Sequence, residues 1–489
     1  MTITKTKKKF AFDVGWVFFA SVVALLIRFL RKTVLARYLG PADLGLFSMC
    51  LTVGSIITLV AGFGVESAVI KYVAECKGDK NKISQLLSSA LITMIVLGIF
   101  SSAILFVLSS TLADIFNMPS LSLLLKIFGI AFPFTLITTI IFGLLNGLRK
   151  MNYFSYANIS RASFAFIFIL IPILIGLGVR GAVLGYVLAE IIIAGIFIAF
   201  IRKYIHFTVR ACKQTTKKLI SFGSRMVGAN AVNMITNQVD ILLIGYFLTA
   251  TEVGYYAIAV ALAGLLSFLP QAIQKITYPT TSEYWSSNDI AGLNKMINKS
   301  MKYSACFLLL VGLGMGFYAR EIITIIFGGD FIYATLPLRV LLIARITRGS
   351  TIVPIGGSLA GVGRPDLSLK TDSVSAIANI MLNILLIPPF GILGAAIATT
   401  TSLILGTIIF LIFTVKTLSV QINIKWYSKF FGLALTTVLL FLFGIKLGSP
   451  YLVGSTVLCI SAILILKFFL TEEDRDMFKS LTLSLIYRR

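Results

Sequence analysis

The chain has 489 residues, of which 58% are hydrophobic and only 13% are charged. Soluble proteins carry about 25% charged residues, so a globule of this composition could not cover its surface in water, and a soluble fold is excluded. With 43 Lys and Arg against 19 Asp and Glu, the net charge is +24. Because no long soluble basic segment is present, we expect no nucleic-acid partner and assign the basic excess to cytoplasmic loops that face anionic lipid.

Fourteen apolar segments are long enough, or nearly so, to cross a membrane as helices, which takes about 20 residues each. These segments are 14–35, 44–69, 86–108, 123–145, 157–177, 182–201, 222–247, 253–273, 306–327, 336–359, 369–387, 392–415, 430–445 and 452–469. The two weakest are 369–387, which contains Asp372 and Asn379, and the short segment 430–445. The sequence therefore predicts an all-α membrane protein with about fourteen transmembrane helices.

The charge of the loops predicts the orientation of the chain. If the N-terminus is cytoplasmic and every segment crosses, most of the Lys and Arg residues fall in or beside inside loops. The outside loops 112–121, 249–252 and 327–335 contain neither residue. Because cytoplasmic loops of membrane proteins are enriched in Lys and Arg, this pattern predicts a multi-pass protein of the cell membrane with both termini in the cytoplasm.

The chain also repeats itself. Residues 37–48 and 246–257 have similar sequences at a shift of 209, and two glycine-containing turns recur further on at shifts of 213 and 214. The aligned glycine pairs are Gly45 with Gly254, Gly147 with Gly361, and Gly178 with Gly391. Six segments separate the copies, an even number, so both halves have the same orientation and are related by an axis along the membrane normal.

This repeat predicts three parts of the chain. Residues 1–210 form an N-terminal six-helix lobe, and residues 211–420 form a second six-helix lobe. Residues 421–489 have no counterpart and hold two additional helices and a cytoplasmic tail. In parallel repeats of this kind, the substrate path is expected at the interface between the lobes.

Catalytic machinery is missing from the sequence. There is no phosphate-binding loop of the Walker A type. The largest polar stretch between segments, near residues 282–302, has no paired catalytic pattern, and the five cysteines are too scattered for a metal site. We therefore expect neither an enzyme nor a resident cofactor or metal, and the sequence leaves open whether Na⁺ or H⁺ couples to transport.

Several basic residues lie inside the apolar segments, where a charge costs about 2.5–3.5 kcal/mol. Arg28, Arg31 and Lys32 share one face of the first segment because they are three and four residues apart. They either snorkel to the interface, pair with Glu66 of the next segment, or line a cationic cavity. Further candidates for binding an anionic substrate are Arg225, Arg345 and Arg348.

Three acidic residues are also embedded, namely Asp240, Glu190 and Glu66. Asp240 follows Asn237 and Gln238 in a polar stripe of the seventh segment. It is either a site that couples transport to a cation or a proton, or the structural partner of Arg225 or another basic group. The same two roles stay open for Glu190.

Residues 35–48 (Leu-Ala-Arg-Tyr-Leu-Gly-Pro-Ala-Asp-Leu-Gly-Leu-Phe-Ser) resemble the first-loop signature of polysaccharide export proteins. These are the O-antigen and oligosaccharide flippases of the multidrug/oligosaccharidyl-lipid/polysaccharide (MOP) superfamily. Residues 143–151, and 240–245 with 254–256, look like two further features of these proteins. The resemblance implies a MATE-like architecture and a central cavity lined by basic residues, a role that Arg28, Arg31, Arg345 and Arg348 would fill.

From the residues and this resemblance we expect a flippase. It would move a polyprenyl-pyrophosphate-linked oligosaccharide from the cytoplasmic to the outer leaflet by alternating access, with the pyrophosphate on the basic cluster. The alternatives are a cation-coupled multidrug exporter and a lipid II-type flippase of the same superfamily. The expected partners are the lipid-linked oligosaccharide, membrane lipids and glycan-assembly enzymes, and the expected state is a monomer.

Overall fold

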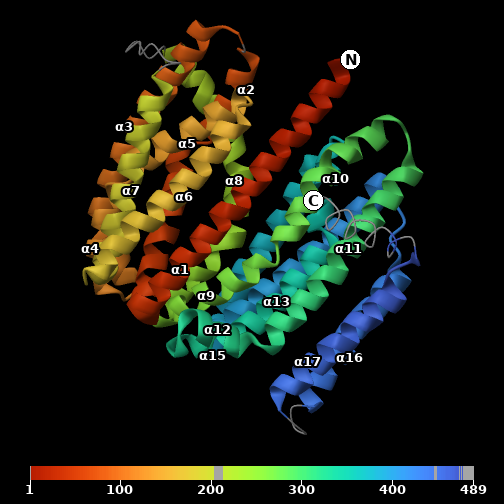
Figure 1. Ribbon diagram of the computed structural model, residues 1–489. Helices are drawn as coiled ribbons and strands as arrows, with labels where there is room; N and C mark the ends of the chain where they lie inside the picture. Colours follow the sequence, from red (N-terminus) through yellow and green to blue (C-terminus); the bar gives the residue numbers. More distant parts are fainter. Residues whose placement is uncertain are drawn as a thin grey trace, which may run out of the picture. The chain divides into compact units, whose positions relative to one another are not determined.

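The computed structural model describes residues 2–76, 78–202, 213–444, 449–472, 474 and 476, and every regular element in these ranges is a helix (Figure 1). The prediction of an all-α fold is confirmed for this part of the chain. The first helices are α1 Thr2–Gly62, α2 Val65–Glu75, α3 Lys80–Ile115, α4 Pro119–Gly129, α5 Phe132–Gly147, α6 Met151–Leu174, α7 Gly178–Ile201 and α8 Lys213–Phe247. They are followed by α9 Ala250–Leu265, α10 Phe268–Ser286, α11 Ile290–Phe317, α12 Ala319–Phe327, α13 Thr335–Thr351, α14 Ser358–Gly361, α15 Pro365–Leu418, α16 Ile424–Gly444 and α17 Pro450–Leu464.

Two of these helices each contain two predicted segments. In α1, Gly40 has φ 73° and ψ −178°, which is not helical, and Pro41 starts a second helical stretch. In α15, Gly391 breaks the helix in the same way with φ 59°. Glycine adopts a positive φ without the steric cost that a Cβ imposes, so both breaks occur where the sequence permits them.

Length and apolarity identify fewer membrane-spanning helices among the described residues than the fourteen that the sequence predicts. Eight described helices are long and apolar enough to cross a membrane, or up to ten if each of two bent pairs is one span. One bent pair is α4 with α5, at 52°, and the other is α9 with α10, at 47°. Neither α8, which carries many polar side chains, nor α13, which has only 17 residues, is among the eight. The count of fourteen stays a prediction.

The chain divides into two compact units. The first unit comprises residues 1–258, 326–331 and 383–395, and the second comprises residues 259–325, 332–382 and 396–489. In the first unit, α6 packs against α1 and α7, and α2 packs against α5 and α8. In the second unit, α11 packs against α10, α13 and α17. The division into lobes at residues 210 and 420 stays a prediction.

The predicted repeat is visible in the backbone. The Lys150 amide donates a hydrogen bond to the Leu145 carbonyl at 2.9 Å, and the Arg364 amide donates to the Leu359 carbonyl at 2.8 Å. These two bonds are related by a shift of 214, and both close the end of a helix in the manner of a Schellman motif. The aligned glycines of the other turn, Gly178 and Gly391, both have a positive φ, at 55° and 59°. The matching hydrogen bonds and the matching glycine conformations support a duplication of the chain.

The two copies of the repeated segment contact each other within the first unit. A Cβ built on Gly45 would lie 1.7 Å from the carbonyl oxygen of Ala250, and one built on Gly254 would lie 2.0 Å from the carbonyl oxygen of Pro41. At the shift of 209, Gly45 aligns with Gly254 and Pro41 aligns with Ala250, so each contact is the repeat image of the other. Only glycine permits such a close approach of two backbones.

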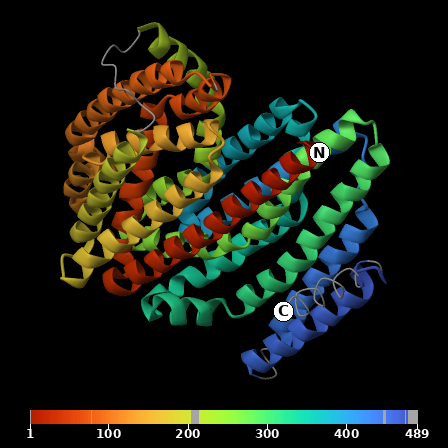
Figure 2. The same ribbon diagram turned by 45° about the horizontal axis from the view of Figure 1, so that its top comes forward.

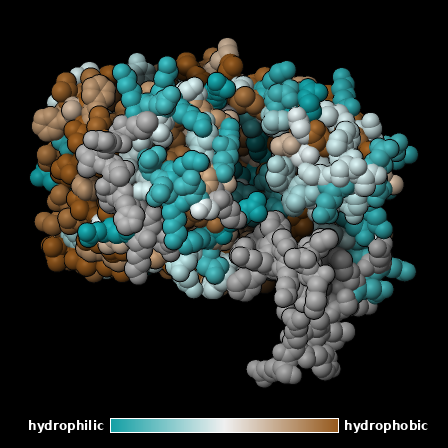
Figure 3. All heavy atoms as spheres, turned by 90° about the horizontal axis from the view of Figure 1, so that it is seen from above, coloured by the Kyte–Doolittle hydropathy of each residue, from teal (hydrophilic) through white to brown (hydrophobic). Residues whose placement is uncertain are grey.

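Helices α16 and α17 lie side by side in both ribbon views (Figures 1 and 2). Their apolar faces pack on α11 in one cluster, where Phe317 and Phe441 are stacked with ring centroids 4.0 Å apart. Hydrophilic side chains gather in patches on the surface that Figure 3 shows from above. Such a face is suited to water and to lipid headgroups rather than to hydrocarbon.

A buried polar network fastens the chain just after α17 to α11. Asp474 is only 1% exposed and accepts hydrogen bonds from Lys302, Tyr303 Oη (2.6 Å) and the Thr471 amide (2.9 Å). Burial alone would raise the pKa of Asp474, but the hydrogen bonds from these groups outweigh it and hold the pKa well below its usual range. The ionised Asp474 network therefore stabilises the folded state fully above the unfolded pKa of about 3.9. This stabilisation is lost as the pH falls through the folded pKa of Asp474.

We expect Asp474→Asn to lower stability at neutral pH by about 2 kcal/mol, the typical size of hydrogen bonds to a charged group. Thermal unfolding of the purified protein in detergent would measure the change. Glu472→Gln is the matched control, because Glu472 is exposed. An unchanged unfolding temperature for Asp474→Asn would show that the network adds nothing to stability.

Candidate functional site

Three arginines gather among α1, α6 and α7 in the first unit. Arg28 and Arg31 share one face of α1, and Arg28 Nη2 donates a hydrogen bond of 2.9 Å to Asn158 Oδ1. Arg161 of α6 donates from Nε (3.1 Å) and from Nη2 (2.9 Å) to the same oxygen of Glu190, Oε1. The charges of the other two arginines and of Glu190 act on Arg31. The cluster thus combines three arginines with one buried carboxylate and is net positive.

Glu190 fixes the position of Arg161. The Glu190 side chain is 2% exposed, whereas that of Arg161 is 29% exposed. A buried carboxylate is costly unless it is paired, so the two side chains hold each other in place. Tyr186 of α7 also hydrogen-bonds Arg161, so a carboxylate and a hydroxyl together orient the guanidinium. The other Glu190 oxygen, Oε2, has no hydrogen-bond partner among the described residues.

The other two residues predicted near this site have different contacts. Lys32 donates a hydrogen bond to the backbone carbonyl of Ala257 in α9. Glu66 on α2 is exposed, and the charge that acts on it is that of Arg161. The proposed ion pair between Glu66 and the α1 arginines is therefore not formed among the described contacts.

Arg161 and Asn158 were not predicted as site residues. Arg161 lies near the start of its apolar segment. A basic side chain at this position can reach the membrane interface, so the sequence alone does not indicate a buried site there. The signal that could have identified it is the spacing of the two residues, because Asn158 and Arg161 are three apart and share a helix face. Glu190, which was predicted, is the residue that reveals Arg161 once the fold is known.

The second unit contains its own pair of arginines on α13. Arg345 and Arg348 are three residues apart, and Arg348 Nη2 donates to Asp372 Oδ1 of α15 at 3.2 Å. The Arg348 side chain is 21% exposed and its Nη1 is buried without a hydrogen-bond partner among the described residues. Gly406 lies beside this pair, and a Cβ built there would lie 2.8 Å from Ser375 Oγ and 3.7 Å from Nη1.

Asp240 contacts two polar side chains of the first unit. It is 5% exposed and accepts hydrogen bonds from Tyr256 Oη (2.7 Å) and from Asn383 Nδ2 (2.9 Å). Arg225 cannot be its partner, because fifteen residues of the same helix separate them by about 22 Å. Arg225 is exposed near the beginning of α8. Within the described ranges, no group of three or more His, Cys, Asp or Glu residues is arranged to hold a metal ion.

Known structures share this architecture. The lipid II flippase MurJ in an inward closed conformation superposes with a TM-score of 0.73 at 19% identity, covering 93% of this chain and 98% of that chain. An inward-facing multidrug resistance MATE family transporter of the MOP superfamily gives a TM-score of 0.64 at 17% identity, covering 81% and 94%. The fold is therefore that of the MOP-superfamily membrane transporters, as the sequence predicted.

Sequence comparison identifies the family to which the chain belongs. The model of the family described as polysaccharide biosynthesis protein matches residues 10–285, and the chain belongs to this family. A probable low-salt glycan biosynthesis flippase of Haloferax volcanii is 25% identical over 448 residues, which is 89% of each chain. A putative O-antigen transporter of Shigella flexneri is 21% identical over 81% of this chain and 95% of the relative. The predicted family is confirmed.

Proposed function

We propose that this protein is a flippase that moves a polyprenyl-pyrophosphate-linked oligosaccharide across the cell membrane. The names of its relatives support a role in glycan export, and they describe transporters rather than enzymes. The observation that carries the proposal is the net positive cluster of Arg28, Arg31 and Arg161 inside a membrane-embedded fold. Guanidinium groups bind phosphate oxygens in a bidentate manner, and a pyrophosphate presents several such oxygens.

In this proposal, arginines from both units contribute to one polar path. Arg345 and Arg348 of the second unit would join the first cluster during transport, and Lys32 and Arg225 would add positive charge along the path. The sugars would cross in the polar path, while the lipid tail would stay in the hydrocarbon, because polar groups are costly there. Alternating access between two six-helix lobes would expose the path to one side at a time.

The orientation is part of the proposal. The positive-inside pattern of the loops supports cytoplasmic termini and insertion in the cell membrane. Transport would run from the cytoplasmic to the outer leaflet, where surface glycans are assembled. We propose a monomer that receives its substrate from glycan-assembly enzymes.

A cation-coupled multidrug exporter is the competing function. Its support is the buried carboxylate of Asp240, which a hydroxyl and an amide hold in place. Buried carboxylates in membrane helices are candidate sites for binding H⁺ or Na⁺. A lipid II-type flippase is the nearer competitor, since it would use the same basic cluster for another pyrophosphate.

Single replacement of Arg28, Arg31, Arg345 and Arg348 by Ala and by Lys tests the proposal. In a strain whose surface glycan depends on this protein, we expect each Ala variant to reduce the glycan about tenfold or more. Lys should rescue only part of the loss, because it lacks the bidentate geometry of Arg. Arg202→Ala is the control, since Arg202 is exposed at the end of α7.

Drug resistance is measured in the same strains, together with Asp240→Asn. If glycan export survives every Ala replacement while drug resistance collapses in Asp240→Asn, the protein is a drug exporter and the flippase proposal fails. Accumulation of lipid II instead of the glycan precursor in the Ala variants would favour the lipid II-type flippase.

A further inference from the structure

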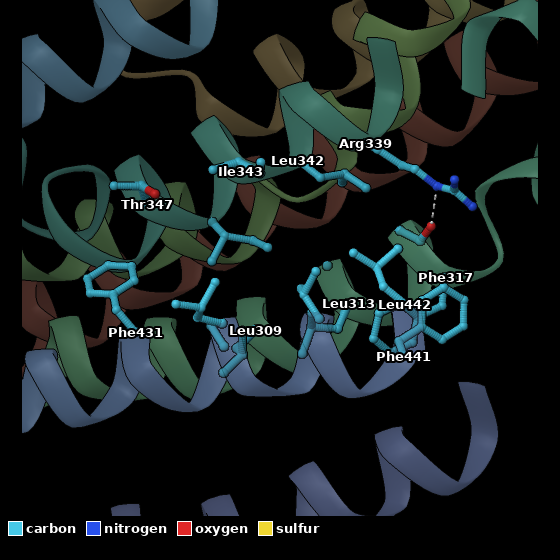
Figure 4. A pocket seen from close by; sticks show the side chains of 16 residues that line it. Leu309, Leu313, Phe317, Arg339, Leu342, Ile343, Thr347, Phe431, Phe441 and Leu442 are labelled. Atoms are coloured by element: carbon cyan, nitrogen blue, oxygen red, sulfur yellow. Dashed lines mark hydrogen bonds between the residues drawn. The ribbon is translucent and has the colours of Figure 1, made fainter. Parts of the chain in front are cut away.

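An apolar groove of about 390 Å³ lies between α11, α13 and α16 in the second unit. Figure 4 shows Leu309, Leu313 and Ile343 along its walls. Gly316 of α11 contributes no side chain, and a Cβ built there would meet only ordinary contact, 3.8 Å from Leu342. The missing side chain at Gly316 therefore leaves this part of the groove wall open.

The length of the groove matches one leaflet of a membrane. On α16 its lining extends from Phe431 to Leu442, which are twelve residues that span about 16 Å along the helix. The hydrocarbon core of a bilayer is about 30 Å thick, so one leaflet contributes about 15 Å. An acyl chain of a membrane phospholipid has this reach, whereas the much longer polyprenyl chain of the proposed substrate would extend beyond the groove.

The guanidinium of Arg339 lies at one end of the groove. Figure 4 shows Arg339 beside Phe317 and Phe441, with Thr347 and Phe431 at the opposite end. Arg339 Nε donates a hydrogen bond of 2.9 Å to the Gly316 carbonyl, which orients the guanidinium. The side chain is exposed, and its two Nη groups have no acceptor within the ranges that the structure describes. An oriented guanidinium with free N–H groups is the geometry that binds phosphate.

We propose that this groove is a binding site for an anionic glycerophospholipid of the bilayer. One acyl chain lies along α11, α13 and α16, and the phosphate accepts hydrogen bonds from Arg339. The charge of Arg339 and the one-leaflet length of the apolar walls select this occupant. The lipid fills the space between α16 and the rest of the second unit, and it is a resident component, distinct from the transported substrate.

Lipid retention by the purified full chain tests the proposal. The wild type and the variants Arg339→Gln and Ala434→Trp are equilibrated with dioleoylphosphatidylglycerol, washed in detergent and weighed by native mass spectrometry. Ala434 lines the groove, so a Trp at this position fills it while leaving Arg339 in place. We expect the wild type to retain one phosphatidylglycerol, and both variants to retain at least about tenfold less, equivalent to about 1.4 kcal/mol.

Arg320→Gln is the matched control, because Arg320 is an exposed arginine at the start of α12 that does not line the groove. It should retain lipid as the wild type does. Two competitors complete the test, namely dioleoylglycerol, which lacks the phosphate, and undecaprenyl phosphate. Neither should displace phosphatidylglycerol at equal concentration.

Three results would overturn the proposal. Equal retention by the wild type and Arg339→Gln would mean that the arginine does not bind the phosphate. Equal competition by dioleoylglycerol would mean that the groove takes any acyl chain. Displacement by undecaprenyl phosphate would assign the groove to the transported substrate. None of these results affects the test of the flippase proposal, which is scored by surface glycan.

Discussion

Arg161→Ala is expected to reduce glycan export about ten- to a hundredfold. Arg161 makes two hydrogen bonds to Glu190 and belongs to the basic cluster with Arg28 and Arg31. Losing charge-assisted hydrogen bonds to a pyrophosphate costs about 1.5–3 kcal/mol, which sets the size of the effect. Surface glycan per molecule of flippase in the membrane is the measurement.

The alanine variant alone does not separate binding from folding. It leaves Glu190 as a buried, unpaired carboxylate, which costs about 3–5 kcal/mol. The double variant Arg161→Met with Glu190→Leu removes both charges, and such apolar pairs often restore stability. We expect the double variant to recover its amount in the membrane but not its export.

Arg180→Ala is the control, because Arg180 is an exposed arginine at the start of α7. If export in the double variant recovers in parallel with the amount of protein, Arg161 acts only as a structural partner of Glu190. The proposed role of Arg161 in substrate binding would then be wrong.

The second large effect is expected at the contact between the repeated segments. Gly45→Ala and Gly254→Ala each place a methyl group within about 2 Å of a backbone oxygen of the other copy. Overpacking of this kind costs about 1–3 kcal/mol, so the contact would form ten- to a hundredfold less often. If transport requires this contact in one of its states, export falls by a similar factor. Surface glycan per molecule of protein in the membrane is the measurement.

Gly264→Ala is the matched control on the same helix, because nothing lies within 4 Å of a Cβ at that position. Alanine is a better helix former than glycine, so neither variant should weaken the local helix. Wild-type export by both Gly45→Ala and Gly254→Ala would show that the close approach of the two copies is dispensable for transport.

Local patterns predicted a large part of this structure. The apolar segments became helices because about 20 residues without charge can cross hydrocarbon only with internal hydrogen bonds. The glycine turns at Gly178 and Gly391 were identified by their repeat, and they share a positive φ. The common face of Arg28 and Arg31 follows from the helical period alone.

The partners of the buried charges could not be predicted in this way. For Asp240 the sequence left a coupling role and a basic partner open, and it did not indicate the hydrogen bonds from Tyr256 and from Asn383, which is 143 residues away in sequence. Glu190 was left without a partner, and Arg161 lies 29 residues before it. Spacing within one helix carries no information about which helix packs beside it.

The sequence by itself determined that this is a membrane protein, that most of the chain is an internal duplication, and which family it belongs to. These properties depend on composition, on segment length and on short motifs, each of which is a local feature of the chain. Only the tertiary structure decided which arginines are clamped by carboxylates, where two glycines let backbones touch, and where an apolar groove ends at Arg339. Such features arise from the packing of helices, and packing depends on the shapes of side chains that are distant in sequence.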